Sequence, residues 1–175
     1  KQTAIYISEQ YDGELRDLLS NMITVSDNDA ANRLVELLGN GDFNVGKEVV
    51  NAFCSANGYS NTHLGRRFMD TNPADDNYTS SSDCRKILSD IYNGVCVNSE
   101  ASEKMLQFLS AQTRKGKIPS GIPSGIQSAN KTGEMPEGYG FDYVICILSN
   151  DLGGRNESAI ERIRNISSYV YEVLK

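Results

Sequence analysis

Apolar residues recur every three or four positions in five stretches of the chain, a spacing that gives a helix one apolar face. In the first stretch, for example, Met22 and Ile23 fall on the same side as the leucines before them. Gly39 follows the second stretch and Asn57 the third, and both residue types end helices. Ser99 is the predicted N-cap of the fifth. The predicted helices are 14–24, 27–38, 45–56, 82–92 and 99–112.

Two later stretches, 127–132 and 142–150, have the pattern of strands. The second is apolar on both faces from Tyr143 to Leu148, which is typical of a central strand covered on two sides. A turn follows it and leads to a last predicted helix, 157–174. Helices around a small sheet predict one α/β domain of the layered α+β type over residues 1–175.

Residues 58–81 show neither period. They are mostly Asn, Asp, Thr, Ser and Arg, with isolated apolar residues such as Leu64 and Phe68. An irregular stretch of this length within one domain is usually functional, and otherwise it marks a missed element. We therefore expect a long loop here.

Composition excludes several classes of protein. A length of 175 residues suits one core, and 39% hydrophobic and 23% charged residues are typical of a folded chain. The longest apolar runs are far too short to cross a bilayer. The formal net charge is −6 and no basic run is present, which argues against nucleic acid as a partner because phosphates need a concentrated positive surface.

The chain has one histidine, His63, in a polar stretch where we expect an ordinary surface or loop residue. A Ser-His-Asp or Cys-His system and a metal site built on several histidines are therefore disfavoured. Nucleophilic chemistry in this chain would need lysine as its base. We expect no metal and no other cofactor.

The four cysteines allow three pairings if all are oxidised. Cys54 and Cys84 lie on apolar helical faces, and Cys146 lies within a predicted strand. These positions favour buried free thiols, which behave as small hydrophobic residues. The fourth cysteine is Cys96.

Two short motifs carry groups suited to chemistry without histidine. Ser26–Asp27–Asn28 lies between two predicted helices, and Lys131–Thr132–Gly133 ends a predicted strand 105 residues further on. A hydroxyl, an amide and an ammonium can move protons and hold a carbonyl in acyl transfer. The order and separation of the two motifs resemble the second and third signature elements of the penicillin-recognising serine hydrolases, in particular the class A β-lactamases.

Longer segments resemble the same family. Residues 18–34 surround the first motif, 62–66 and 77–83 resemble the stretches on either side of the family's omega loop, and 118–134 resemble the approach to the second motif. The resemblance covers nearly the whole chain. It implies the β-lactamase and transpeptidase fold, in which a small antiparallel sheet packs with helices.

The resemblance implies roles for single residues. Ser26 would relay a proton to the leaving nitrogen of a β-lactam or peptide, and Asn28 would bind the substrate's amide carbonyl and the catalytic lysine. Lys131 would supply positive charge to Ser26 and to the substrate carboxylate. The alternative is that Asp27 merely caps a helix and that Lys131 is a solvated charge at the end of a strand.

Three further residues follow Lys131. By the same resemblance, the Thr132 hydroxyl would be a second donor to the substrate carboxylate, and Gly133 would keep the strand edge open. The backbone N–H of Glu134 would be one half of the oxyanion hole, and one such donor lowers a barrier by about 3–4 kcal/mol.

The sequence departs from the family at the nucleophile. The family carries it in a Ser-x-x-Lys element well before the first motif, but the pattern occurs here only at 128–131, within the second motif. The chain as printed is therefore predicted to form no acyl-enzyme. The family's omega-loop glutamate, which drives deacylation in class A enzymes, is also missing, because the 58–81 stretch holds only Asp70, Asp75 and Asp76 as acidic residues. A complete version would hydrolyse its acyl-enzyme slowly.

The family has two further strands after the second motif, and only 142–150 is found. We expect an incomplete domain with an uncovered apolar surface. Self-association or another segment would cover that surface.

These observations favour a serine β-lactamase-like hydrolase of β-lactams or D-alanyl peptides, seen without its nucleophile. Two alternatives stay open: a non-catalytic domain that binds or senses β-lactam or peptidoglycan, and a structural module of the cell wall. The family works outside the cytoplasmic membrane, so we expect an extracellular, periplasmic or surface-anchored protein.

Overall fold

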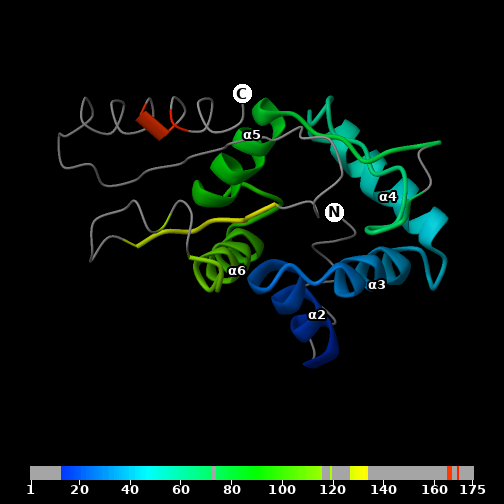
Figure 1. Ribbon diagram of the computed structural model, residues 1–175, viewed down its shortest axis with the longest axis horizontal. Coiled ribbons are helices and arrows are strands. Elements are labelled where there is room, and N and C mark those ends of the chain that lie inside the picture. Colours follow the sequence, from blue (N-terminus) through cyan, green and yellow to red (C-terminus); the bar gives the residue numbers. More distant parts are fainter. Residues whose placement is uncertain are drawn as a thin grey trace.

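The computed structural model describes residues 13–71, 74–115, 119, 127–133, 165–166 and 169. The helices in these ranges confirm those predicted at 14–24, 27–38, 45–56, 82–92 and 99–112, with ends that differ by at most two residues. Gly39 and Asn57 are C-caps, as predicted. The helices are α2 (Gly13–Thr24), α3 (Asn28–Leu38), α4 (Phe43–Ala56), α5 (Ser81–Tyr92) and α6 (Ser99–Ser110), as Figure 1 shows.

Side-chain caps explain where two of the helices begin. Asp42 accepts from the backbone N–H of Asn44 at 2.7 Å, and so α4 starts two residues before its predicted beginning. The predicted cap of α6, Ser99, is wrong. Asn98 is the cap, with its side-chain oxygen 2.8 Å from the N–H of Ala101, and Ser99 is the first helical residue.

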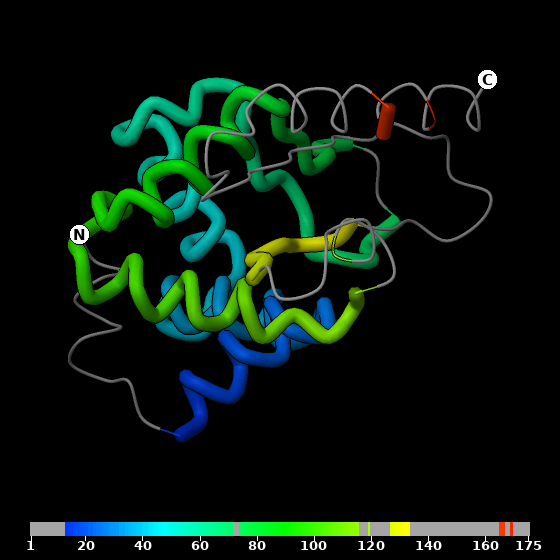
Figure 2. Tube along the Cα trace, turned by 90° about the vertical axis from the view of Figure 1, so that its left-hand side faces the viewer, coloured from blue at the N-terminus to red at the C-terminus, as the bar shows by residue number. Residues whose placement is uncertain are grey.

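Helix α2 joins two packed halves. Helix α3 packs against α4 and α2, while α6 packs against α5 and α2, and the two views agree on this arrangement (Figures 1 and 2). Burial of apolar area in each half supplies the main stabilising free energy. The first half buries a cluster of Val35, Phe43 and Leu64. The second buries Ile91, Cys96 and Leu109, and partly buried residues that include Ile23 and Ala129 pack against it.

Helices α3 and α4 cross closely because the contact residue of α4 has no side chain. A Cβ on Gly46 would lie 1.8 Å from the Val35 carbonyl oxygen and 3.1 Å from the Val35 side chain. Only glycine allows the two backbones to approach this far.

The described residues of 58–80 lack helix and strand apart from one isolated antiparallel bridge between His63 and Tyr78, which confirms the predicted loop except at Ser81, where α5 begins. Two asparagines, Asn51 of α4 and Asn32 of α3, hydrogen-bond to the backbone of this loop. Asn51 of α4 accepts from the N–H of Leu64 at 2.8 Å and donates to its carbonyl at 2.9 Å. Because a side-chain amide has the same donor and acceptor as a peptide, each contact resembles a pair of ladder hydrogen bonds.

The single histidine, His63, is a half-buried residue of this loop. His63 Nε2 lies 2.9 Å from a carboxylate oxygen of Asp75, and its ring stacks on Tyr78 at a centroid distance of 5.2 Å. Lys47 of α4 reaches the other oxygen of Asp75 at 3.4 Å and the Gly65 carbonyl at 3.1 Å. These bonds, first that of His63 and then that of Lys47, hold the pKa of the Asp75 carboxyl below its ordinary value of 3.8.

We expect acid to loosen this loop. A carboxyl whose pKa is lowered by folding stabilises the folded state above its unfolded pKa, and this contribution is lost as the pH falls through the folded pKa. Hydrogen exchange of the Leu64 and Gly65 amides, corrected for intrinsic rates, should therefore speed up below about pH 4. Asp75→Asn should reduce the response, whereas Glu100→Gln, which removes the Lys104 partner on α6, should leave it unchanged. An equal response in both variants would contradict the assignment to Asp75.

Three of the cysteines lie among the described residues and all are free thiols. Cys54 and Cys96 are buried, as expected for thiols that act as hydrophobic residues, and burial raises the pKa of both. Cys84 is half-buried, and Cys146 lies outside the described residues.

The predicted sheet stays a prediction. Residues 127–133 have no strand partner within the part of the chain that the structure describes, and the predicted strand 142–150 lies outside it, as does most of the predicted helix 157–174. None of the described helices is long and apolar enough to cross a membrane.

Candidate active site

Ser26 lies in the tight turn between α2 and α3. Its φ of 60° is in the left-handed region, which costs an L-residue with a side chain about 1 kcal/mol. The Asn21 carbonyl accepts from the N–H groups of Val25 at 3.3 Å and Asp27 at 3.1 Å, and this closes the turn from the α2 side. Asp27 closes it from the other side as the N-cap of α3, accepting from the N–H of Ala30 at 3.0 Å. Strain held by surrounding bonds is a frequent property of functional sites.

Lys131 comes to Ser26 from 105 residues away. The segment before it is anchored, since Asn130 is buried and donates its N–H to the Leu109 carbonyl of α6 at 3.1 Å. The Lys131 ammonium donates to the Ser26 hydroxyl oxygen and, at 2.7 Å, to the Thr132 carbonyl. The structure thus brings the two motifs into contact. Asp27 does cap a helix, but Lys131 is more than a solvated charge.

The Ser26–Lys131 contact has a defined direction. An ammonium only donates, so the Ser26 oxygen is the acceptor and its own proton remains for another acceptor. The positive charge of the ammonium beside the hydroxyl oxygen also makes loss of the Ser26 proton easier. The geometry therefore leaves the Ser26 proton available to a group that binds beside the pair.

The structure describes three of the four other predicted site residues. Asn28 is the first residue of α3 and is exposed. The Thr132 hydroxyl oxygen is buried and finds no hydrogen-bond partner among the described residues, a state that costs free energy unless a ligand supplies the partner. Gly133 faces open space, since a Cβ there would meet nothing within 4 Å. Glu134 lies outside the described residues.

One residue that the sequence analysis missed connects the 58–81 loop to this site. Asn32 lies one helical turn after Asn28, on the same face of α3. Its side-chain amide accepts from the N–H of Phe68 at 2.9 Å and donates to the Phe68 carbonyl at 3.2 Å. The available signal was the spacing of four residues between the two asparagines.

Two of the loop's three carboxylates are engaged with cations. Asp75 binds His63 and Lys47, as described above, and Asp76 pairs with Arg66 at 2.7 Å. Asp70 is exposed. The Asn32 side chain fixes the backbone of a different loop residue, Phe68, near Asn28.

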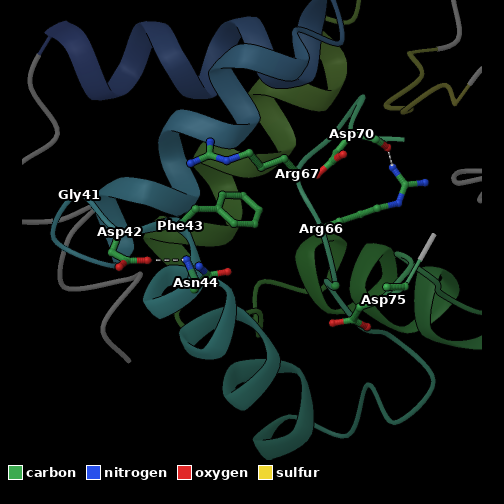
Figure 3. A pocket seen from close by; sticks show the side chains of 10 residues that line it. Gly41, Asp42, Phe43, Asn44, Arg66, Arg67, Asp70 and Asp75 are labelled. Atoms are coloured by element: carbon green, nitrogen blue, oxygen red, sulfur yellow. Dashed lines mark hydrogen bonds between the residues drawn. The ribbon is translucent and has the colours of Figure 1, made fainter. Parts of the chain in front are cut away.

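A cavity of about 460 Å³ is separate from the Ser26–Lys131 pair. Figure 3 shows it between the beginning of α4 and the loop, with the side chains of Arg66 and Arg67 pointing apart. Arg67 lies over the Phe43 ring at 4.5 Å and pairs with Glu36 at 2.7 Å, so its charge is satisfied within the protein. The lining residues are Gly41, Asp42, Phe43, Asn44, Gly65, Arg66, Arg67, Asp70, Ala74 and Asp75.

Comparison with known proteins identifies a family that this chain matches. The sequence profile of a family described as "Beta-lactamase enzyme family" matches residues 4–174. No curated protein matches the chain. Among the described residues, no group of three or more His, Cys, Asp or Glu side chains could hold a metal ion.

Proposed function

Since the chain belongs to the beta-lactamase enzyme family, we propose that it forms the proton-transfer and substrate-binding part of a serine hydrolase that acts on β-lactams or D-alanyl peptides. The observation that carries the proposal is the Lys131 ammonium on the Ser26 hydroxyl. Class A β-lactamases are the subgroup that the two motifs resemble most.

The attacking serine belongs, in this proposal, to a Ser-x-x-Lys element outside the printed sequence. Its oxygen bonds to the substrate carbonyl carbon, and the carbonyl–nitrogen bond breaks to leave an ester on that serine. The leaving nitrogen takes the Ser26 proton, and Ser26 is reprotonated with the proton that the attacking serine gave to its lysine. Lys131 stays an ammonium and stabilises the negative charge that develops on Ser26.

Substrate binding uses the groups around this pair. The buried Thr132 hydroxyl, beside the Lys131 charge, supports recognition of a carboxylate such as that of a penicillin or of a D-alanyl peptide. Asn28 would hold the substrate's amide carbonyl, and the Glu134 N–H would face the carbonyl oxygen under attack. Because peptidoglycan lies outside the cytoplasmic membrane, we propose that the enzyme works there.

The acidic residues of the 58–81 loop support a long-lived acyl-enzyme. Asn32 fixes the Phe68 backbone one turn from Asn28, and the 58–81 loop contains no glutamate. Asp75 and Asp76 of this loop are paired with cations, which makes them less available to activate a water molecule against the ester. We therefore propose slow release, as in a penicillin-binding protein.

Mass spectrometry with a labelled penicillin tests the function. The natural protein that contains this chain should gain the mass of one penicillin, and the adduct should outlast its own formation time many times over. The gene should encode a Ser-x-x-Lys element well before Ser26. A gene without such an element, or a protein that shows no adduct at any time, would contradict the proposal.

A second candidate is a non-catalytic domain that binds or senses the same ligands. It is favoured by one observation, that the buried Thr132 hydroxyl has no hydrogen-bond partner among the described residues and so suits a bound carboxylate. Calorimetry would then show reversible binding of a carboxylate ligand that is lost in Thr132→Val, without any mass shift.

A further inference from the structure

The segment 112–114, directly after α6, hydrogen-bonds to the C-terminal end of α2. Thr113 donates to the Thr24 carbonyl from its backbone N–H at 3.0 Å and from its hydroxyl at 2.8 Å. The Arg114 guanidinium donates to the Val25 carbonyl at 3.3 Å. The last carbonyls of a helix have no partner within that helix, so these bonds replace the missing ones. They reach to the residue directly before Ser26.

Gln112 is the buried member of this contact. Its side chain is fully buried, with 0% exposure. The amide nitrogen donates to the Ile23 carbonyl at 2.8 Å, and the amide oxygen accepts from the Arg114 N–H at 3.0 Å. Both ends of the amide are thus used, one on α2 and one on the segment that binds the Val25 carbonyl.

The same end of α6 also holds the other half of the site. The Leu109 carbonyl accepts from the N–H of Asn130, the residue before Lys131, and Ala129 packs against the buried cluster that contains Leu109. Ile23 packs against that cluster as well. Figures 1 and 2 show α6 beside both α2 and the segment 127–133. The relative position of Ser26 and Lys131 is therefore set through α6.

We infer that Gln112 is a positioning residue for the Ser26–Lys131 pair: its two hydrogen bonds hold the α2 end and the 112–114 segment together, so that the strained Ser26 turn presents its hydroxyl to Lys131. This inference rests on the proposed function. Ser26 has a left-handed φ of 60°, a conformation that surrounding bonds must maintain. Without the Gln112 amide, the turn can relax away from the ammonium.

Gln112→Leu tests this role against Ser102→Ala. Ser102 is a matched control on α6, because it is also buried, at 1% exposure, and its hydroxyl donates to the Cys96 and Asn98 carbonyls at 3.0 and 2.8 Å, away from Ser26. In the natural protein, Gln112→Leu should lower the acylation rate constant for a labelled penicillin about 100-fold, the cost of misplacing a reacting group by about 1 Å. Ser102→Ala should lose stability but keep its rate.

Gln112→Glu is the conservative variant. Its buried carboxyl can donate to the Ile23 carbonyl only when it is protonated, so acylation should recover towards the wild-type rate as the pH falls, in contrast to the Leu variant. A second readout needs no acylation. The ¹⁵N resonance of the Lys131 ammonium, assigned with Lys131→Arg, should move in Gln112→Leu and stay in Ser102→Ala.

Equal rates and unmoved Lys131 resonances in Gln112→Leu and Ser102→Ala would overturn the inference. The ammonium resonance decides it even if Gln112→Leu does not fold, because Gln112→Glu at high pH lacks the same donor. If the wild-type protein forms no adduct, the proposed function fails, and the resonance alone still shows whether Gln112 positions the pair.

Discussion

Lys131→Ala is expected to lower the acylation rate constant about 100- to 10,000-fold, the range that one positioned acid–base group contributes. The Lys131 ammonium donates to the Ser26 hydroxyl oxygen. Without this ammonium, no neighbouring positive charge stabilises the negative charge that develops on the Ser26 oxygen as its proton leaves. The rate constant is measured from the growth of the penicillin adduct in time-resolved mass spectra of the natural protein.

The control for this variant is Lys104→Ala. Lys104 is a lysine of α6 that pairs with Glu100 at 2.7 Å, and its removal changes the net charge by the same amount without touching the Ser26 turn. The control should acylate at the wild-type rate. If Lys131→Ala did so too, Ser26 would not depend on the lysine, and the role proposed for the pair would be wrong.

Gly46→Ala is expected to cause the largest loss of stability, roughly 3 kcal/mol or more in the free energy of unfolding. The new Cβ would lie 1.8 Å from the Val35 carbonyl oxygen, and since this neighbour is backbone, the two helices α3 and α4 must move apart to admit it. Urea unfolding of the natural protein, followed by circular dichroism, measures the change.

Gly13→Ala provides the comparison, because a Cβ at Gly13, the first residue of α2, would meet nothing within 4 Å. This variant should be as stable as the wild type or slightly more so, since alanine has the higher helix propensity. Equal stability of the two variants would mean that α3 and α4 do not need the close approach at Gly46.

Helix positions were predictable because the signals are local. The apolar spacing in 14–24 and the stops at Gly39 and Asn57 act within a few residues, and the structure confirms them. The error at Ser99 arose among neighbours of similar chemistry. Both Asn98 and Ser99 can cap a helix, and the choice depends on which of them has the extended backbone, here Asn98 with φ −157° and ψ 174°.

The site was predictable in its parts. The chemistry of a serine, an asparagine and a lysine without histidine pointed to acyl transfer, and the two motifs pointed to the family that the whole-chain match supports. The contact between the 58–81 loop and α3 was not predictable. Asn32 and the Phe68 backbone are 36 positions apart in the sequence and share no local pattern.

The amino-acid sequence by itself determined where the helices form, that residues 58–81 are a loop, and which groups are available for chemistry, because these follow from spacing and side-chain type. Only the tertiary structure decided that the Lys131 ammonium meets the Ser26 hydroxyl and that the buried Gln112 amide donates to the Ile23 carbonyl. The physical reason is that both contacts depend on how α6 packs between distant segments, and the free energy of that packing comes from the buried cluster as a whole and not from any short stretch of the chain.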